Sequence, residues 1–248
     1  MESDRSLLSG NLLLASLPAA AVDALLPSCD DIVLEPGMVL QTAAEPIRHV
    51  YFPRNGLISV RATLSSGDEI NLAAVGRNGG IGLTGGLGSE IASSNAVVRI
   101  GGDATRTDLP SLRRAAAASE AFRSLIARYV EAFLVEVQQN AACNALHEVE
   151  QRLCRWLLQT MDRVGDDIAL THEFLSYALG VRRQTVSVVA GRLQAAGVIR
   201  YHRGHVEILD RSSLEAHACE CYRVVRRHVR LLIPDAPAPE KAADQRRK

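Results

Sequence analysis

The residues with the most evident chemistry in this 248-residue sequence are its five cysteines. Their odd number and scattered positions argue against a disulfide framework. Three potential metal ligands do lie close together, since His217, Cys219 and Cys221 form an H-x-C-x-C cluster. A tetrahedral structural site needs a fourth ligand and usually about two to four residues between its cysteines. We therefore expect free thiols near a helix end and no metal site, with metal binding by this cluster as the alternative.

A second group is a run of arginines between residues 174 and 206, where the sequence contains no Asp, Glu or Lys. The five arginines of this stretch are Arg182, Arg183, Arg192, Arg200 and Arg203. The chain as a whole is neutral, with 28 basic and 28 acidic residues, but residues 1–142 carry a net charge of −4 and residues 143–248 a net charge of +4. Such an asymmetry favours contact with nucleic acid or a membrane, and a solvated helix face is the alternative.

Glycines dominate a third segment, residues 76–88, in which seven of thirteen positions are glycine. Glycine allows a positive φ angle or a close approach of the backbone to a ligand. The spacing matches neither a Walker phosphate loop nor a dinucleotide-binding fingerprint, so a ligand loop and a plain turn stay open as alternatives. Ser, His and Asp occur in no spacing typical of a nucleophile with its base, and we expect no enzymatic activity.

The first half of the chain contains short β-branched runs separated by turn residues, after a broken helical segment at residues 6–27. The predicted strands are residues 31–34, 49–52, 57–62, 70–75 and 96–100. Several short strands with turns between them are typical of a sandwich or a barrel.

Beyond Pro110 the pattern becomes helical. Apolar residues from Phe122 to Val137 recur at alternating steps of three and one, which places them on one face of a helix. A helix over residues 119–140 is roughly 33 Å long at 1.5 Å per residue, too long for a small β-domain to cover. We expect its beginning to pack on the β-domain and its stripe to pair with a second copy, an intrachain core being the alternative. The predicted dimer contacts are Phe122, Ile126, Tyr129, Phe133 and Val137.

After a second amphipathic helix at residues 145–164, two short helices are predicted around Gly180. Thr171 is a suitable N-cap for the first, and Gly197 stands where the second, beginning at Arg183, requires a C-terminal cap. Residues 198–209 then predict a β-hairpin with a basic tip. Two helices joined at a glycine and followed by such a hairpin indicate a winged helix-turn-helix.

The segment LTHEFLSYALGVRRQTVSVVAGRLQAAGVI, together with this hairpin, resembles the winged DNA-binding domain of the Crp/Fnr family of bacterial transcription regulators. The resemblance covers about residues 10–213 and is more specific in the DNA-binding half. It implies an α+β fold with a cyclic-nucleotide-binding-like β-roll at residues 1–110. It further implies a dimerisation helix at residues 111–142 and a winged helix-turn-helix at 143–213. The chain would end with a C-terminal helix and a disordered tail at 214–248.

The resemblance also implies which residues contact DNA. Arg183 and Gln184 match the base-reading positions of the family, Val188 stands where many members carry Arg, and Arg182 replaces the usual Ser at the start of the recognition helix. The candidate DNA-binding residues are Thr171, Arg182, Arg183, Gln184, Thr185, Ser187, Arg192, His202 and Arg203.

The sensor half departs further from the family. Members that bind cyclic AMP carry a Glu after the phosphate-cassette glycine and an Arg-Ser/Thr pair about ten residues on, but here Leu83 follows Gly82 and the later stretch is Ser-Ser-Asn-Ala. Without its arginine partner an anionic phosphate loses a charge-assisted contact. Cys29 is the one N-terminal cysteine, so an iron–sulfur sensor is not expected either. The candidate effector pocket consists of Gly76, Arg77, Gly79, Gly82, Leu83 and Ser94.

These observations together predict a homodimeric, sequence-specific transcription regulator that reads an inverted-repeat operator. The expected partners are double-stranded DNA, a second copy of the chain and RNA polymerase, with no membrane and no cofactor. Because the first ten residues lack the features of a signal peptide, we expect a cytoplasmic protein. A small-molecule-binding module whose main role is ligand capture is the alternative function.

Overall fold

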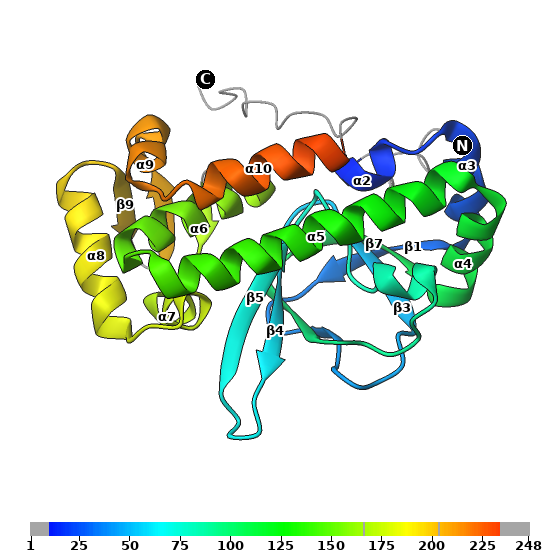
Figure 1. Ribbon diagram of the computed structural model, residues 1–248, viewed down its shortest axis with the longest axis horizontal. Helices are drawn as coiled ribbons and strands as arrows, with labels where there is room; N and C mark the ends of the chain where they lie inside the picture. Colours follow the sequence, from blue (N-terminus) through cyan, green and yellow to red (C-terminus); the bar gives the residue numbers. More distant parts are fainter. Residues whose placement is uncertain (1–9, 166, 203, 234–248) are drawn as a thin grey trace.

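The computed structural model describes residues 10–165, 167–202 and 204–233, so the predicted tail beyond residue 233 lies outside the described residues. Its first part is a β-roll of two antiparallel sheets, with strand orders β1-β7-β3 and β2-β6-β4-β5 (Figure 1). The strands are β1 (Cys29–Leu34), β2 (Val39–Gln41), β3 (His49–Pro53), β4 (Leu57–Thr63), β5 (Glu69–Val75), β6 (Asn95–Ile100) and β7 (Gly102–Asp108). The α+β fold class and all five predicted strands are therefore confirmed.

Two strands, β2 and β7, were not predicted from the sequence. β2 is short and its residues are exposed or half-buried, so it has no apolar signature. β7 lies between β1 and β3, yet the residues that it buries are Ala104, Thr105 and Thr107. A strand with small or hydroxylated inward residues has no alternation of large apolar and polar residues to reveal it.

The helices surround the roll and continue beyond it. In the first half they are α2 (Leu12–Ala15), α3 (Ala19–Leu25), α4 (Leu109–Ala118) and α5 (Glu120–Leu146), with short 3-10 turns η1 (Leu26–Ser28) and η2 (Leu83–Leu87). In the second half they are α6 (Val149–Val164), α7 (His172–Leu179), α8 (Arg183–Ala195), α9 (Arg211–His217) and α10 (Cys221–Leu232). A small sheet of order β8-β10-β9 completes this half, with β8 (Asp167–Ala169), β9 (Ile199–His202) and β10 (His205–Ile208).

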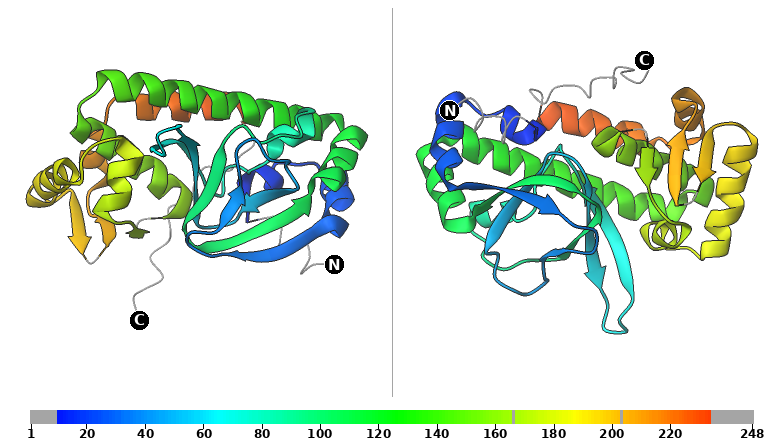
Figure 2. Two further views of the ribbon diagram at one scale, coloured as in Figure 1. Left: turned by 90° about the horizontal axis from the view of Figure 1, so that it is seen from below. Right: turned by 180° about the vertical axis from the view of Figure 1, so that it is seen from behind.

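The long helix α5 runs along the whole molecule (Figures 1 and 2). Its first part packs on the β-roll, its end reaches the C-terminal helices, and α10 runs back beside it in the opposite direction. α5 ends at His147 and Glu148, whose extended backbones separate it from α6. A capping box between Glu148 and Gln151 begins α6, which is why the second helix starts later than the predicted residue 145.

A buried polar network joins β5, α5 and α6. Arg163 of α6 places one guanidinium nitrogen 2.8 Å from each carboxylate oxygen of Glu136 on α5, and both side chains are almost fully buried. One turn further along α5, Asn140 donates to the carbonyl of Leu72 in β5 at 2.7 Å and accepts from Arg155 of α6. The network thereby ties the β-roll to the helix that begins the C-terminal unit.

We expect Glu136→Gln to destabilise the protein strongly, because it leaves the buried guanidinium of Arg163 without its counter-charge. Breaking one side of a buried pair costs on the order of 3–5 kcal/mol of unfolding free energy. Glu207→Gln is the matched control, since Glu207 pairs with Arg200 at 2.8 Å on the surface, where such pairs contribute about 0–1 kcal/mol. Urea denaturation of the two variants measures the difference, and equal losses would contradict this role of the network.

Candidate nucleic-acid interface

The turn between α7 and α8 follows from local sequence signals. Thr171 is the N-cap of α7, and its hydroxyl oxygen accepts from the backbone N–H of Phe174 at 3.1 Å. Gly180 ends α7 in the left-handed region, with a φ of 62°. Arg182 precedes α8 without a side-chain capping bond, as its replacement of a serine implies. The predicted helices on either side of Gly180 are therefore confirmed.

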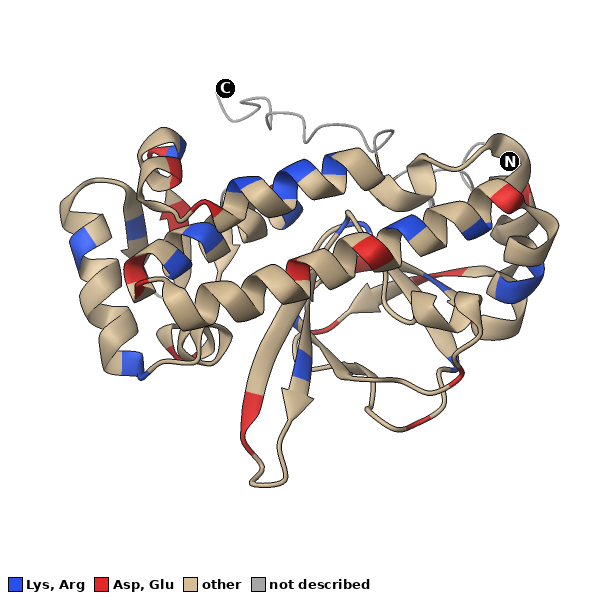
Figure 3. Cartoon of the chain, in the orientation of Figure 1, with Lys and Arg blue, Asp and Glu red and all other residues tan. Residues whose placement is uncertain are grey.

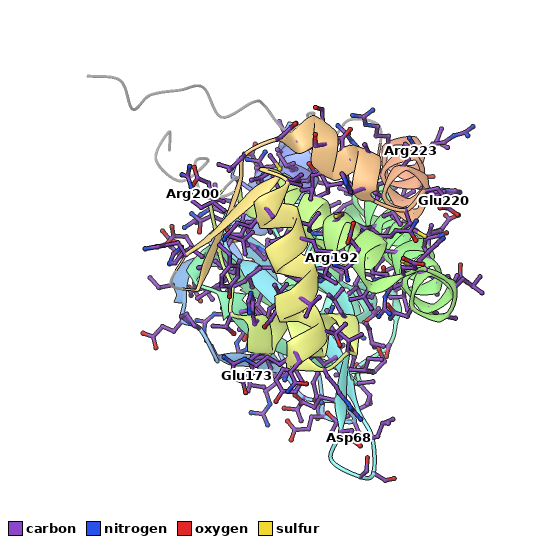
Figure 4. The ribbon with its side chains drawn as sticks, turned by 90° about the vertical axis from the view of Figure 1, so that its left-hand side faces the viewer. Asp68, Glu173, Arg192, Arg200, Glu220 and Arg223 are labelled. Atoms are coloured by element: carbon purple, nitrogen blue, oxygen red, sulfur yellow. The ribbon has the colours of Figure 1, made fainter. Side chains whose placement is uncertain are left out.

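The helix α8 has one buried and one exposed face. Val186, Val189, Ala190 and Leu193 pack into the core of the C-terminal unit, together with Trp156 and Leu175 among others. The exposed side chains of this region are Arg182, Arg183, Gln184, Ser187, Val188 and Arg192, while Thr185 is half-buried. Val188 is 58% exposed although it is apolar. The sequence-predicted residues of this helix thus share one solvent face, at one end of the molecule (Figure 4).

The arginines of this region differ in their pairing. Arg192 lies 3.4 Å from Glu150 of α6, and Arg200 lies 2.8 Å from Glu207 on the neighbouring strand. Arg182 and Arg183 form no ion pair with any residue that the structure describes. Figure 3 shows basic and no acidic positions on α8 itself. The start of α8 is therefore the part of this face with uncompensated positive charge.

The predicted hairpin beside α8 is present as β9 and β10, and β8 adds a third strand that was not predicted. His202 is exposed at the end of β9, whereas Arg203 lies outside the described residues. The hairpin is joined to the start of α7 through Tyr201, whose hydroxyl donates to the carbonyl of Leu170 at 2.9 Å. Tyr201 also lies against the ring of His172, with 4.1 Å between the ring centroids.

His172 is a residue of this interface that the sequence did not single out. Its Nδ1 atom lies 3.0 Å from the hydroxyl of Ser187 on α8, so the ring connects the hairpin with the exposed helix. Burial and the neighbouring positive charge of Arg183 lower the pKa of His172, because both disfavour the charged form of the ring. No local sequence signal reveals this role, because its partners stand 15 and 29 positions further along the chain.

The structure divides the candidate effector residues into two groups. Gly82, Leu83 and Ser94 line a hollow that opens to solvent, together with Gln41, Thr84, Tyr129 and Phe133 among others. No charged side chain of the described chain lines it. Gly76, Arg77 and Gly79 lie outside it. A Cβ on Gly76 would meet Arg163 of α6 at 2.7 Å, and one on Gly79 would meet Tyr129 of α5 at 2.5 Å. These two glycines therefore allow the segment after β5 to lie close to both helices.

The candidate dimer residues also fall into two groups. Phe122, Ile126 and Tyr129 are buried in the chain's own core, with exposed fractions of 1%, 0% and 9%. Phe133 and Val137 are half-buried. The first three side chains therefore pack within one chain and leave no surface for a second copy, which the periodicity of the stripe alone does not reveal.

Comparisons with known proteins agree with this architecture. A family model described as a Crp-like helix-turn-helix domain matches residues 151–217. Among solved structures, FixK2 from Bradyrhizobium japonicum is similar with a TM-score of 0.68 and 17% identity, over 77% of this chain and 98% of that chain. A CRP-family transcriptional regulator from Thermus thermophilus is similar with a TM-score of 0.62 and 23% identity, over 75% and 96% of the two chains. No curated protein matches by sequence.

The c-di-GMP responsive global regulator CLP from Xanthomonas campestris gives a TM-score of 0.62 at 16% identity, over 78% of this chain and 100% of that chain. The β-roll, the long helix and the exposed α8 beside its hairpin define a winged helix-turn-helix protein with an N-terminal β-roll. The chain contains a Crp-like helix-turn-helix domain within the fold of the Crp/Fnr family of transcription regulators, and the predicted resemblance is confirmed. Among the described helices, none combines the length and apolarity that a bilayer span requires.

The two glycines of the helix-turn-helix provide a matched test of its backbone. A Cβ added at either Gly180 or Gly191 meets no atom within 4 Å, but only Gly180 has a positive φ. We expect Gly180→Ala to lower the unfolding free energy by about 1–2 kcal/mol through left-handed strain. Gly191→Ala lies within α8 and should raise it by up to about 1 kcal/mol. Thermal unfolding of both variants checks these signs, and the same sign for both would contradict the assigned turn.

Proposed function

We propose that this chain is a homodimeric transcription regulator that reads DNA sequence with the exposed face of α8. The observation that carries the proposal is the start of this helix, where Arg182 and Arg183 are exposed and free of ion pairs with described residues while the opposite face is buried in the core. Such a helix inserts into the major groove, and its backbone and wing contacts to phosphates hold it in register. RNA polymerase is a further proposed partner, and the protein acts in the cytoplasm without a catalytic step.

The proposed base readers are Arg183 and Gln184. A guanidinium donates two hydrogen bonds to guanine O6 and N7, and an amide pairs with adenine N6 and N7, each contributing roughly 1–3 kcal/mol of discrimination. In a dimer, two recognition helices enter successive major grooves about 34 Å apart, so the operator is an inverted repeat. Val188 offers only apolar contact at the next position, which favours an operator unlike those of family members that carry Arg there.

We expect Arg183→Ala to relax the base preference at one position of each half-site, because it removes a bidentate hydrogen bond to a base. Arg203→Ala, at the proposed phosphate-contacting tip of the wing, should weaken binding to all sequences about equally. It should also reduce the slope of the logarithm of the binding constant against the logarithm of the salt concentration, by roughly one unit for each phosphate that is no longer neutralised. A selected operator and scrambled DNA, titrated at several salt concentrations, separate the two effects.

Arg223→Ala is the control for charge alone, since Arg223 is exposed on α10, away from the exposed face of α8 (Figure 4). It should leave the preference for the operator unchanged. If Arg183→Ala weakens binding to operator and scrambled DNA by the same factor, Arg183 does not read a base. If gel shifts with genomic fragments show no specific complex, ligand capture becomes the better function for the chain.

The proposed dimer contact is a seam on the outer side of α5. Its residues recur at steps of three and four, the spacing of a coiled coil: Ala127, Val130, Leu134, Val137 and Ala141. Each of them is exposed or half-buried, and Leu134 is 53% exposed. Figure 2 shows that one side of the α5 ribbon is not covered by another described element, while Val130 of the seam borders the hollow beside Gly82 and Leu83. The seam replaces Phe122, Ile126 and Tyr129 as contact residues and retains Val137.

We expect Leu134→Glu to convert the dimer into monomers, because two carboxylates would face each other across the two-fold axis. The matched control is Leu231→Glu, since Leu231 is an exposed leucine of α10 outside the seam. Analytical ultracentrifugation measures the outcome, and circular dichroism confirms that both variants fold. A Leu134→Glu protein that still sediments as a dimer would place the interface elsewhere.

We also propose that the β-roll has lost cyclic AMP binding. The hollow around Gly82 and Ser94 contains hydroxyl and amide groups, and none of the described residues that line it offers a guanidinium to pair with a phosphate. Isothermal calorimetry with cyclic AMP at micromolar concentration should therefore give no heat of binding. A saturable isotherm would contradict this proposal and would direct attention to Arg77 and Arg99 as phosphate partners.

A further inference from the structure

Four potential metal ligands from distant segments meet where α5 ends. Cys143 and His147 stand four residues apart, on the last turn of α5 and at its C-cap. Cys219 precedes α10 and Cys221 is its first residue. The three sulfur atoms and a ring nitrogen of His147 all lie within 4.8 Å of one another. His217, the third member of the H-x-C-x-C motif, is exposed and uses its Nδ1 atom toward the carbonyl of Ser213 instead.

We propose that Cys143, His147, Cys219 and Cys221 form a structural zinc site of the Cys3His type. The Sγ atoms of Cys143 and Cys219 are 3.5 Å apart, and Nδ1 of His147 lies 3.4 Å from Sγ of Cys221. A tetrahedral zinc ion with Zn–S bonds of about 2.3 Å and Zn–N bonds of about 2.0 Å has ligand-to-ligand edges of roughly 3.5–3.8 Å. Two of the six ligand-to-ligand distances therefore match those of a zinc site, and the other four do not exceed 4.8 Å.

The groups around these ligands match those of metal centres. Nε2 of His147 lies 3.3 Å from a carboxylate oxygen of Glu220, which orients the ring so that Nδ1 faces the three sulfurs. A carboxylate behind a ligating histidine is a recurrent feature of zinc sites, because it fixes the tautomer and increases ligand basicity. The side-chain amide of Gln139 donates to Sγ of Cys221 at 3.1 Å, a hydrogen bond that favours a thiolate.

Burial and charge also favour an ion at this position. The three cysteines are almost fully buried and form a small cluster of their own, so a structural ion would be enclosed by four protein ligands with no open position. Arg155 donates to the side chain of Asn140, which lies one turn before Cys143 on α5, so its positive charge lies near the cluster. Three thiolates and one zinc ion leave one net negative charge, to which Arg155 provides a nearby counter-charge.

Other uses of the same residues fit less well. A disulfide between Cys143 and Cys219 requires sulfurs about 2.0 Å apart and leaves Cys221 and His147 without a role. An iron–sulfur cluster places several irons and sulfides between its cysteines and needs a wider cage. Calcium and magnesium prefer oxygen ligands, whereas thiolates with an imidazole suit zinc.

The position of the site defines what the ion would do. Cys143 and His147 precede the Crp-like domain at residues 151–217 in the sequence, and Cys219 and Cys221 follow it. The ion would therefore join the end of α5, before the domain, to the start of α10, after it. Because the site is not preformed in the unfolded chain, the free energy of metal binding adds to the stability of the folded chain. Zinc would therefore hold the DNA-binding unit on the long helix.

The test uses the full-length, untagged chain, purified under reducing conditions and dialysed against micromolar zinc. We expect mass spectrometry to find about one zinc ion per chain, released when the thiols are modified. Replacement by Co²⁺ should give the thiolate charge-transfer and tetrahedral d–d absorption bands of a sulfur-rich site. Chelation should lower the midpoint of thermal unfolding.

Four variants make the assignment specific. Cys219→Ser should lose the metal, while Cys29→Ser and His217→Gln should retain it, because these two residues lie outside the cluster. Cys219→Ser removes a buried ligand and can unfold the chain, so Glu220→Gln provides a milder variant with all four ligands intact. It should weaken zinc affinity by about 10–100-fold.

A wild-type chain that binds no zinc or cobalt under these conditions would overturn the proposal. Full retention of zinc in a folded Cys219→Ser chain, or its loss in His217→Gln, would overturn it as well. If the chain binds no metal and a Cys143–Cys219 disulfide forms in air, the cluster serves redox chemistry instead. None of these outcomes depends on DNA binding, so the experiments test the zinc site independently of the proposed function.

Discussion

The buried ion pair between Glu136 and Arg163 is the constraint on which the arrangement of the two halves depends. Two charges removed from water must remain in contact, because separation leaves each without solvation. Since Glu136 lies on α5 and Arg163 on α6, this requirement limits how α6 can turn relative to the long helix. Asn140 extends the restriction to the β-roll through the carbonyl of Leu72. A shift of β5 would therefore displace the beginning of the C-terminal unit, where α6 lies.

The long helix α5 distributes its surface among several partners. Its first turns bury Phe122 and Ile126 in the core beneath the N-terminal helices, and its middle places Glu136 and Asn140 in the polar junction. α10 covers another side, where Val229 packs against the same core. The remaining outer face contains the seam around Leu134. Because each side of α5 contacts a different element, apolar and polar patches alternate around the helix and do not form a single apolar stripe.

The proposed DNA contact on α8 and the proposed zinc site at the end of α5 are connected through the packing of α6. The exposed face of α8 rests on a core shared with α6, and α6 is fixed to α5 by Arg163. The ligands at the end of α5 would add a second attachment through α10. Rigid support of this kind keeps recognition side chains in register with DNA, because phosphate and base contacts require a defined orientation of the helix.

Local signals in the sequence determined the helix-turn-helix. Thr171 caps α7 through its own hydroxyl, and Gly180 and Gly197 adopt positive φ angles that few other residues tolerate. The five strands with β-branched runs were likewise predictable, because the signal for each lies within a few residues. β7 was not, since its inward side chains are small, and its place between β1 and β3 depends on pairing with residues far along the chain.

What only the tertiary structure decided are the features that depend on contacts between distant residues. Periodicity placed Phe122 and Ile126 on one face of a helix, but packing with the rest of the chain decided that this face is internal. The sequence also showed five arginines without nearby acids, yet Glu150 and Glu207 pair with two of them. The cysteine cluster is the clearest case. Cys143 and Cys219 stand 76 positions apart, and only the return of α10 along α5 brings their sulfur atoms together.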